Sequence, residues 1–428
     1  MREMKDSGIE WIGNIPASWK SVPMRYLFRE CTTKNRLGQE KTALKFTYGT
    51  IIPKKNFNAN TDDYVANTIM SYTVVHPGVI MINCLNLNYD FVSQRIGLVK
   101  DYGAITSAYL AIEPNSQVLS AYATYQLKSW DAAKAFHNMG TGVRKTLDFS
   151  ELGKKHFVLP TLGEQKNIVE FLDSQCSEID AISADIQKEI EILEQYKRSV
   201  ITEAVTKGLN PDVEMKNSGL RWCEKIPATW EMIPAKYLFH NSDTRKFPND
   251  ELLTASQKYG LISQTDYMKR ENAKIVLANA GIENWKHVEP NDFVISLRSF
   301  QGGLEMSEIS GCVTWHYVVL RAAQKVFQRY YKWLFKSSKY INALQATCNF
   351  IRDGQDLRFS NFAKVPLFIP PYKEQCEIAA YLDEKTNAID AVMQSKKKQL
   401  EVLDSYKKSL IYEYVTGKKE VPLWKSNT

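Results

Sequence analysis

The sequence has few of the residues from which metal sites, disulfide frameworks and membrane spans are built. Its 428 residues include seven cysteines, an odd number with no Cys-x-x-Cys pair, which argues against a disulfide framework and a zinc site. The six histidines form no closely spaced pair. No window approaches about 18 uninterrupted apolar residues, and the N-terminus lacks a hydrophobic signal core. We therefore expect a cytoplasmic protein with no membrane partner.

Motifs of stand-alone enzymes are also scarce. Residues 369–372 (IPPY) have Ile where an amino-methyltransferase needs Asn or Asp to hold the target amino group. Residues 140–146 (GTGVRKT) resemble a phosphate-binding loop only weakly, because they lack the Gly before Lys and do not open a helix after a strand. We therefore expect no catalytic residue, no metal site and no cofactor bound by this chain.

Glycine and proline are absent from residues 164–207, which predicts one long amphipathic α-helix. At the α-helical rise, a segment of this length spans about 66 Å, longer than a small domain is wide, so we expect a spacer between globular bodies. Its apolar residues fall mostly three or four positions apart, the spacing of a single stripe. They are Ile168, Leu172, Ile179, Ile182, Ile186, Ile190, Leu193, Tyr196 and Val200.

A second segment, residues 374–417, repeats this pattern 210 positions later. Identities also repeat: FLD matches YLD, EIDAI matches AIDAV, and EQYKRSVITEAVT matches DSYKKSLIYEYVT. Two such helices in one chain most simply pack on each other as an antiparallel coiled coil. The residues predicted for helix packing or partner binding are Ile179, Ile182, Ile186, Leu193, Ile389, Val392, Leu400 and Leu403.

The duplication extends to the segments before the helices. Residues 4–28 align without a gap with residues 215–239, sharing Ser-Gly, two tryptophans, Ile-Pro and Tyr-Leu-Phe. The aromatic residues of these segments are predicted to lie in the core. Each half is therefore expected to be a globular module followed by a long helix. The predicted boundaries are 1–160 for the first module, 161–210 for the first helix, 211–370 for the second module, and 371–428 for the second helix with the C-terminal tail.

The order of predicted elements within the modules indicates an α/β class. In the first module, residues 48–52 are a predicted strand or strand edge with a Gly turn. Strand candidates at 76–83 and 108–112 follow, before a helix at 121–136. The second module repeats this order, with strand candidates at 259–263, 289–296 and 313–320 before a helix at 327–346. The predicted fold is two similar globular α/β domains separated by two long antiparallel helices, with an internal pseudo-two-fold duplication.

Both modules are basic, whereas the first helix is acidic. Residues 1–160 carry 19 Lys and Arg against 13 Asp and Glu, and residues 211–370 carry 21 against 16. Residues 161–210 carry 5 against 10. This distribution suits modules that bind a polyanion and helices that stay off it.

Polar side chains on the loops after the predicted strands can pair with base edges in the major groove of DNA. Arginine and lysine in the polar loops that close each module are better suited to phosphate contacts. The phosphate-binding candidates are Arg144, Lys145, Arg352 and Arg358. The base-reading candidates are Asn83, Asn86, Arg95, Arg298, Ser299 and Gln301.

The sequence resembles the specificity (S) subunit of type I restriction-modification systems. The resemblance rests on W-x3-IP-x2-W at residues 11–19 and 222–230, on LP-x3-EQ and IP-x3-EQ at the helix starts, and on Val-Thr at the helix ends. It implies two target-recognition domains, each reading half of a split DNA sequence, on two antiparallel helices. It also implies no catalytic residues in this chain.

The same resemblance implies several partners. They are double-stranded DNA, two methyltransferase (M) subunits that bind S-adenosylmethionine and methylate adenine, and motor-nuclease (R) subunits that complete the restriction complex. The alternative is a coiled-coil scaffold that joins two protein-binding modules without nucleic acid. A nuclease or methyltransferase that acts alone is disfavoured by the missing motifs.

Overall fold

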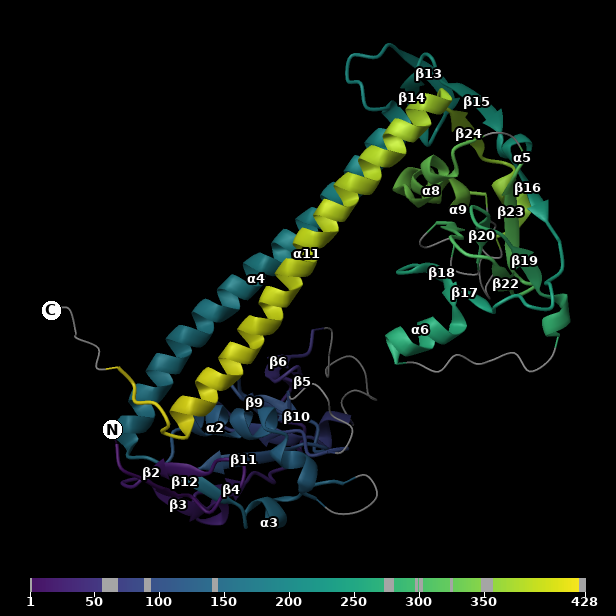
Figure 1. Ribbon diagram of the computed structural model, residues 1–428. Helices are drawn as coiled ribbons and strands as arrows, with labels where there is room; N and C mark the ends of the chain where they lie inside the picture. Colours follow the sequence, from purple (N-terminus) through teal and green to yellow (C-terminus); the bar gives the residue numbers. More distant parts are fainter. Residues whose placement is uncertain are drawn as a thin grey trace. The chain divides into compact units, whose positions relative to one another are not determined.

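The computed structural model describes residues 2–55, 68–87, 94–140, 145–272, 281–296, 299, 303–323, 326–347 and 357–422. The fold combines short strands with two long helices (Figure 1). It divides into two compact units. The first unit comprises Met1–Ile186 with Lys398–Thr428, and the second comprises Gln187–Lys397. Each unit therefore contains one module together with a part of both long helices.

The long helices are α4, Leu162–Lys207, and α11, Tyr372–Val415. Helix α4 begins with a capping box: the Thr161 hydroxyl accepts from the Glu164 amide at 3.3 Å, and the Glu164 carboxylate accepts from the Thr161 amide at 3.1 Å. Left-handed glycines follow both helices, Gly208 at φ 75° and Gly417 at φ 69°. These local signals account for the close agreement with the predicted helices.

Within each unit the two helices run antiparallel. In the first unit Lys407 Nζ lies 2.6 Å from Asp180 Oδ1, and in the second Lys197 Nζ lies 2.6 Å from Asp390 Oδ2. The two ion pairs are the same pair, repeated 210 residues apart. The predicted antiparallel coiled coil and the pseudo-two-fold repeat are therefore confirmed within each unit.

The contact between the helices follows a seam of buried and half-buried positions that alternate in steps of four and three, the coiled-coil repeat. On α4 the seam comprises Ile179, Ser183, Ile186, Ile190, Leu193, Lys197 and Val200. On α11 it comprises Ile389, Met393, Lys396, Leu400, Leu403, Lys407 and Leu410.

Two of the residues predicted for helix packing lie outside this seam. Ile182 is 44% exposed and Val392 is 46% exposed, so packing between the helices is wrong for both. The prediction used the spacing of apolar residues alone. In the structure the next residue in each helix, Ser183 or Met393, occupies the seam position. Ile179, Ile186, Leu193, Ile389, Leu400 and Leu403 do lie in the seam.

The first module is built on an antiparallel sheet in the order β4-β11-β8-β9. Its strands are β4 Phe28–Glu30, β11 Leu110–Pro114, β8 Ile80–Ile82 and β9 Ile96–Leu98. Four strand pairs surround it: β1 Met4–Asp6 with β2 Asn14–Pro16, β3 Lys20–Pro23 with β12 His156–Leu159, β5 Leu44–Thr47 with β6 Thr50–Pro53, and β7 Thr73–Val75 with β10 Gly103–Ile105. The helices are α2 Ser120–Ala132 and α3 Phe149–Leu152.

The second module has the same topology, with a sheet in the order β16-β23-β20-β21. Its strands are β16 Phe239–Ser242, β23 Val318–Ala322, β20 Phe293–Ile295 and β21 Glu305–Met306. The pairs are β13 Met215–Leu220 with β14 Cys223–Pro227, β15 Glu231–Pro234 with β24 Pro366–Ile369, β17 Leu253–Ser256 with β18 Gly260–Ser263, and β19 Lys286–Val288 with β22 Gly311–Val313. The helices are α5 Ala235–Leu238, α6 Gln264–Glu271, α8 Gln328–Lys336, α9 Ser338–Gln345 and α10 Phe359–Phe362.

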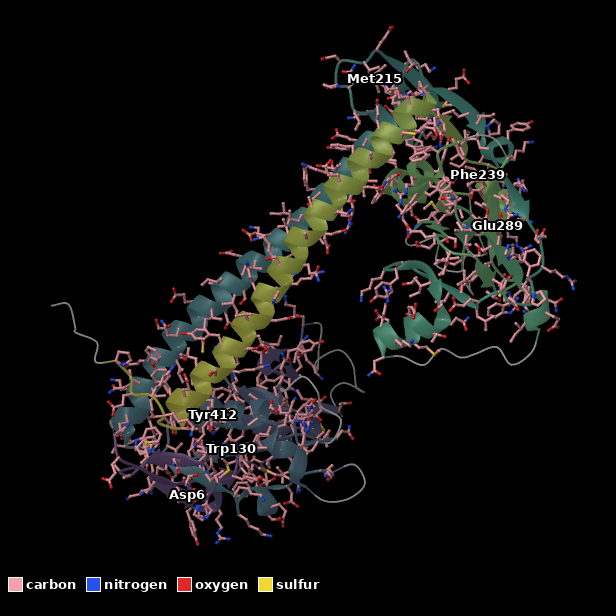
Figure 2. All side chains as sticks on the ribbon, viewed as in Figure 1. Asp6, Trp130, Met215, Phe239, Glu289 and Tyr412 are labelled. Carbon is pink, nitrogen blue, oxygen red and sulfur yellow. The ribbon has the colours of Figure 1, made fainter. Side chains whose placement is uncertain are left out.

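Each module packs on the start of one long helix and the end of the other. The Tyr122 hydroxyl donates to the Val415 carbonyl at 3.0 Å, and the Tyr330 hydroxyl donates to the Val205 carbonyl at 3.0 Å. In the first unit Trp130 lies in the core below the helix end that carries Tyr412 (Figure 2). The end of α11 thus completes the core of the first module, as the end of α4 completes the core of the second.

The tryptophans at the start of each module pack in the core, as predicted, whereas Tyr26 is 63% exposed, so a core position is wrong for this tyrosine. Trp19 and Trp230 are buried, and their indole N–H groups donate to Glu164 at 3.0 Å and Glu374 at 2.9 Å. Each bond ties the start of a module to the first turn of its own long helix. In the part of the chain that the structure describes, no helix is long and apolar enough to cross a membrane.

Candidate nucleic-acid interface

Arg95 holds the loop that follows β8 in the first module. Its guanidinium donates to three backbone carbonyls, those of Asn83 at 2.8 Å, Leu85 at 2.9 Å and Asn86 at 3.2 Å. Its amide donates to Asp131 at 2.8 Å. Because Arg95 is only 2% exposed, the predicted direct contact with a base is wrong for this residue. It fixes the conformation of the loop instead.

The predicted first-module loops meet in the structure. The Leu87 amide donates to the Lys145 carbonyl at 3.2 Å, and the Leu147 amide donates to the Cys84 carbonyl at 3.2 Å. These bonds bring Lys145, half-buried, close to the loop that carries exposed Asn86. Asn86 has a left-handed backbone, at φ 50°.

Asn83, at the start of this loop, is half-buried, and its side-chain oxygen accepts from the Leu85 amide at 3.2 Å. Asn83 therefore shapes the turn. A DNA contact from Asn86 or Lys145 stays a prediction.

The second-module candidates divide in the same way. Ser299 is buried, and its hydroxyl accepts from the Ser296 amide at 2.8 Å, so a base contact is wrong for this residue too. Arg358 is exposed beside the start of α10, where its amide donates to Asn361 at 3.1 Å. A phosphate contact from Arg358 stays a prediction. Arg144, Arg298, Gln301 and Arg352 lie outside the described residues.

A feature absent from the predicted site is the tip of the β5–β6 hairpin. Residues 48–52 were expected to be a strand or strand edge with a Gly turn; Tyr48 and Gly49 form the turn, and the strand β6 follows from Thr50. A β-carbon on Gly49 would lie 3.4 Å from the Ile96 carbonyl oxygen and 4.0 Å from the Gln94 side chain. The tip therefore lies against the chain where it leaves the loop held by Arg95.

Comparison with known proteins shows which family this arrangement is similar to. Residues 227–402 match the family model "Type I restriction modification DNA specificity domain". The match covers less than half of the chain, and together with the relatives below it shows that the chain is similar to type I restriction-modification specificity subunits. The predicted resemblance is therefore confirmed, and the shared topology extends the same architecture to the first module.

Two relatives from Methanocaldococcus jannaschii carry specificity-subunit names. The putative type I restriction enzyme MjaX specificity subunit is 21% identical over 326 residues, which cover 72% of this chain and 70% of the relative. The MjaVIII specificity subunit is 23% identical over 335 residues, covering 74% of each chain. A chain from a solved structure described as the "structural basis underlying complex assembly and conformational transition of the type I R-M system" matches with a TM-score of 0.69 at 13% identity, covering 95% of this chain and 99% of that one. The last likeness bears on the fold alone.

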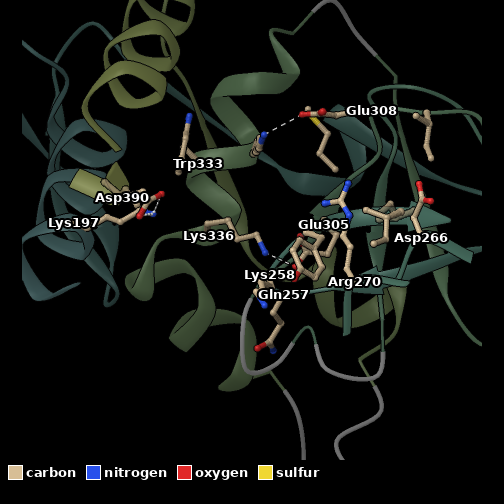
Figure 3. Close-up of a pocket in the computed structure, with 18 of the residues that line it drawn as sticks. Lys197, Gln257, Lys258, Asp266, Arg270, Glu305, Glu308, Trp333, Lys336 and Asp390 are labelled. Carbon is tan, nitrogen blue, oxygen red and sulfur yellow. Dashed lines mark hydrogen bonds and ion pairs between the residues drawn. The ribbon is translucent and has the colours of Figure 1, made fainter. Parts of the chain in front are cut away.

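The specificity domain of the second unit borders a crevice of about 1160 Å³ between the β17–β18 hairpin, α8 and the long helices (Figure 3). Lys336 forms an ion pair with Glu305 at its base, where burial raises the pKa of the Glu305 carboxyl and Lys336 lowers it in part. The Trp333 indole donates to Asp383 at 2.9 Å beside it. This crevice is a polar groove between module and helices.

The first unit has the related crevice, of about 700 Å³. Here the Tyr125 hydroxyl donates to Asp173 at 2.7 Å, the counterpart of the Trp333–Asp383 bond. Tyr48 from the hairpin tip lines this crevice, as Tyr259 lines the other. The duplication has therefore kept the position of each hairpin relative to the helices of its own unit.

Two buried cysteines, Cys84 and Cys312, have little nucleophilic character. Burial raises the pKa of the Cys84 thiol to about 12 and that of the Cys312 thiol to about 11. At neutral pH both are uncharged thiols, and the thiolate is the reactive form. Among the described residues, no three His, Cys, Asp or Glu side chains come together in a way that could hold a metal ion.

Proposed function

We propose that this chain is the DNA-reading subunit of a type I restriction-modification complex and that it recognises a bipartite target. Each module reads one half-site through its loop edge, and the helix pair sets the distance between the halves. The proposal is carried by the duplication: two modules of one topology on helices whose ion pairs, Lys407–Asp180 and Lys197–Asp390, repeat 210 residues apart.

The position of the candidate side chains supports DNA as the ligand. Asn86 and Arg358 are exposed at loop edges, and Lys145 is held beside the first of these loops. Asparagine can form two hydrogen bonds with adenine in the major groove, while Lys145 and Arg358 suit phosphate oxygens. Both modules are basic, as expected for surfaces that displace counterions from DNA.

Exposed apolar residues on the long helices support the docking of a partner. Each lies one position before a seam residue, outside the helix–helix contact. In an antiparallel pair, the positions preceding the seam on both helices share one face. Three equivalent pairs follow the duplication: Ile182 and Val392, Ile192 and Val402, and Tyr196 and Tyr406.

We assign this exposed stripe to two copies of one partner, because each member of the stripe occurs twice at the same offset. The partner is an adenine methyltransferase subunit, which supplies the catalytic residues and binds S-adenosylmethionine. In this proposal the present chain binds no cofactor and has no activity of its own. Motor-nuclease subunits join the complex for restriction.

Methylation mapping tests the proposal. DNA from cells that express this chain with its methyltransferase should carry methyladenine in one bipartite sequence, and cells with the methyltransferase alone should not. The purified chain should bind duplex DNA with an affinity that falls steeply as salt is added.

Methyl transfer by the chain alone would refute its non-catalytic role. Absence of DNA binding both by the chain and by its complex with the methyltransferase would instead favour the protein-binding scaffold.

A further inference from the structure

The turn of the β5–β6 hairpin places a tyrosine where a smaller residue is preferred. Tyr48 and Gly49 link Thr47 to Thr50, and both have positive φ, 48° and 73°. Two-residue turns of this kind favour Asn-Gly, Asp-Gly or Gly-Gly, because a β-carbon is crowded in the left-handed region. An aromatic residue in this position strains the backbone.

The strained tyrosine is also displayed to solvent. Tyr48 is 80% exposed, so its ring gains little packing against the module. The strands beneath it are fixed: Leu44 and Ile51 are buried, and Phe46 packs edge-on against Tyr109 with ring centroids 5.4 Å apart. A rigid hairpin thus holds a large aromatic ring out from the surface. Strain and exposure together indicate a ligand rather than a folding role.

The ring stands beside the candidate reading loop. Gly49 packs near Gln94 and the Ile96 carbonyl, immediately after Arg95 has closed the loop. The crevice that Tyr48 borders is lined by lysines and aspartates in equal number: Lys100, Lys128, Lys407 and Lys408 with Asp131, Asp173, Asp180 and Asp404. The exposed ring beside a polar loop, rather than the charge of the crevice, is therefore the feature that suits stacking on a base.

The second module keeps the Tyr-Gly sequence but not the free ring. Tyr259 is half-buried, and its hydroxyl donates to Glu271 at 2.7 Å. The centroid of its ring lies 4.8 Å from Lys258 Nζ and 5.1 Å from Arg270 Cζ. Helix α6 supplies both Arg270 and Glu271. In the second hairpin, the Tyr259 ring is therefore fixed by its hydrogen bond and flanked by cations, whereas in the first hairpin the Tyr48 ring is exposed to solvent.

We propose that Tyr48 stacks its ring on a base of the bound DNA at the edge of the half-site read by the first module. Stacking of an exposed ring requires a base step that opens locally, as in other proteins that wedge apolar side chains between base pairs. The inference rests on the proposed DNA-binding function and adds a positioning contact to it.

The test uses the full chain in complex with its methyltransferase and a duplex containing the methylation-mapped target. Single adenines across both half-sites and the gap are replaced by 2-aminopurine, whose fluorescence changes when its stacking changes. The wild-type complex should change the fluorescence at a position beside one half-site. Tyr48→Asn should abolish this change and weaken binding about 5- to 100-fold, the effect of losing one base–aromatic stack.

Asparagine is the informative replacement because it accepts the left-handed turn and lacks the ring. Its Tm should equal or exceed that of the wild type, which separates lost stacking from misfolding. Tyr48→Phe should keep the fluorescence change, since the ring and not the hydroxyl makes the contact. Tyr102→Ala, which removes another exposed tyrosine of the first module, should have no effect.

Unchanged binding and fluorescence in Tyr48→Asn would overturn the inference and leave the DNA-reading function intact. Equal losses in Tyr48→Phe and Tyr48→Asn would also overturn it, because the hydroxyl would then be the contacting group. A wild-type complex that binds no DNA would refute the proposed function and this inference with it.

Discussion

One guanidinium determines the shape of the loop after β8. Arg95 joins the carbonyls of Asn83, Leu85 and Asn86 from a buried position, a task that its planar fork of donors suits better than the single ammonium of lysine. In the proposed function, the side chain that would contact DNA and the side chain that fixes the loop are therefore different residues. Asn86 is exposed on the loop, and Arg95 lies beneath it.

Replacing Arg95 should damage stability and recognition together. Arg95→Ala leaves carbonyls without their charged donor and should lower the free energy of unfolding by about 2–4 kcal/mol. Arg95→Lys should lie between Ala and the wild type. Urea unfolding measures the loss, and methylation mapping should show reduced modification.

Asn86→Gly is the matched control on the same loop. Glycine accepts the left-handed backbone of Asn86, and the side chain that it removes is exposed, so the variant should change stability by no more than about 0.5 kcal/mol while relaxing the choice of base. Wild-type stability in Arg95→Ala would contradict the role of Arg95 in fixing the loop after β8.

Glu164 links the start of α4 to the first module and makes this contact sensitive to acid. Burial raises the pKa of the Glu164 carboxyl, but hydrogen bonds from Trp19, Thr161 and Arg2 together hold it below its ordinary value. A carboxyl with a lowered folded-state pKa stabilises the protein above its unfolded pKa, and this contribution is lost as pH falls through the folded value. The affected window therefore lies below about pH 5.

Glu164→Gln removes this titration. The variant should be less stable than the wild type at pH 7, and the difference should shrink as pH falls from about 5 toward 3. Urea unfolding of both proteins across this range measures it. A difference that stays constant with pH would show that Glu164 contributes through shape alone.

At the scale of elements, the long helices were predictable because several local signals agree. The segments lack interior proline, start at a capping box or a proline turn, and end before left-handed glycines. The seam was harder to predict, because it includes the polar residues Ser183, Lys197 and Lys407. Apolar spacing alone selects the apolar residue just before each of them instead. Lysine is tolerated there because its stem packs in the seam while its ammonium reaches an aspartate.

The loop residues were less predictable for a different reason. Arg95 donates to backbone carbonyls, and the Ser299 hydroxyl accepts from a backbone amide. Because every residue has these backbone groups, the sequence does not identify the partners. A Gly turn was expected near Gly49, but the hairpin tip was not predicted as part of the site, because Tyr-Gly is not a usual pair for a two-residue hairpin turn. Such departures from local preference are expected where function constrains the chain.

The exposed stripe on the helices predicts how assembly depends on single residues. Tyr406→Glu in the first unit should prevent docking of one methyltransferase copy, and Tyr196→Glu in the second should prevent docking of the other. A carboxylate buried at an apolar contact should weaken binding at that site by at least about 10-fold. Light scattering of the purified complex measures its stoichiometry.

Each single variant should form a complex with one methyltransferase, and the double variant should form none. Glu191→Lys, a charge change elsewhere on the same helix surface, is the matched control and should assemble normally. A double variant that still binds two methyltransferase copies would show that the docking site lies outside this exposed stripe.

At the scale of the whole molecule, helix length should set the gap between the half-sites. The ion pairs Lys407–Asp180 and Lys197–Asp390 lie on opposite sides of the internal repeat centre, close to Lys188 and Lys398. Duplicating residues 182–188 in α4 and 392–398 in α11 therefore lengthens both helices at facing positions. One heptad in each helix keeps the seam in phase and leaves both ion pairs intact.

Each lengthened helix gains about 10.5 Å, equivalent to about three base pairs of DNA. Every added base pair also turns the distal half-site by about 35°, so the modules must reorient to follow the groove. We therefore expect a gap wider by about one to three base pairs, with the half-site bases unchanged, because the reading loops are untouched. Adding the heptad to α4 alone breaks the seam and should abolish modification. A methylation map in which the double insertion keeps the original gap would exclude the helix pair as the ruler.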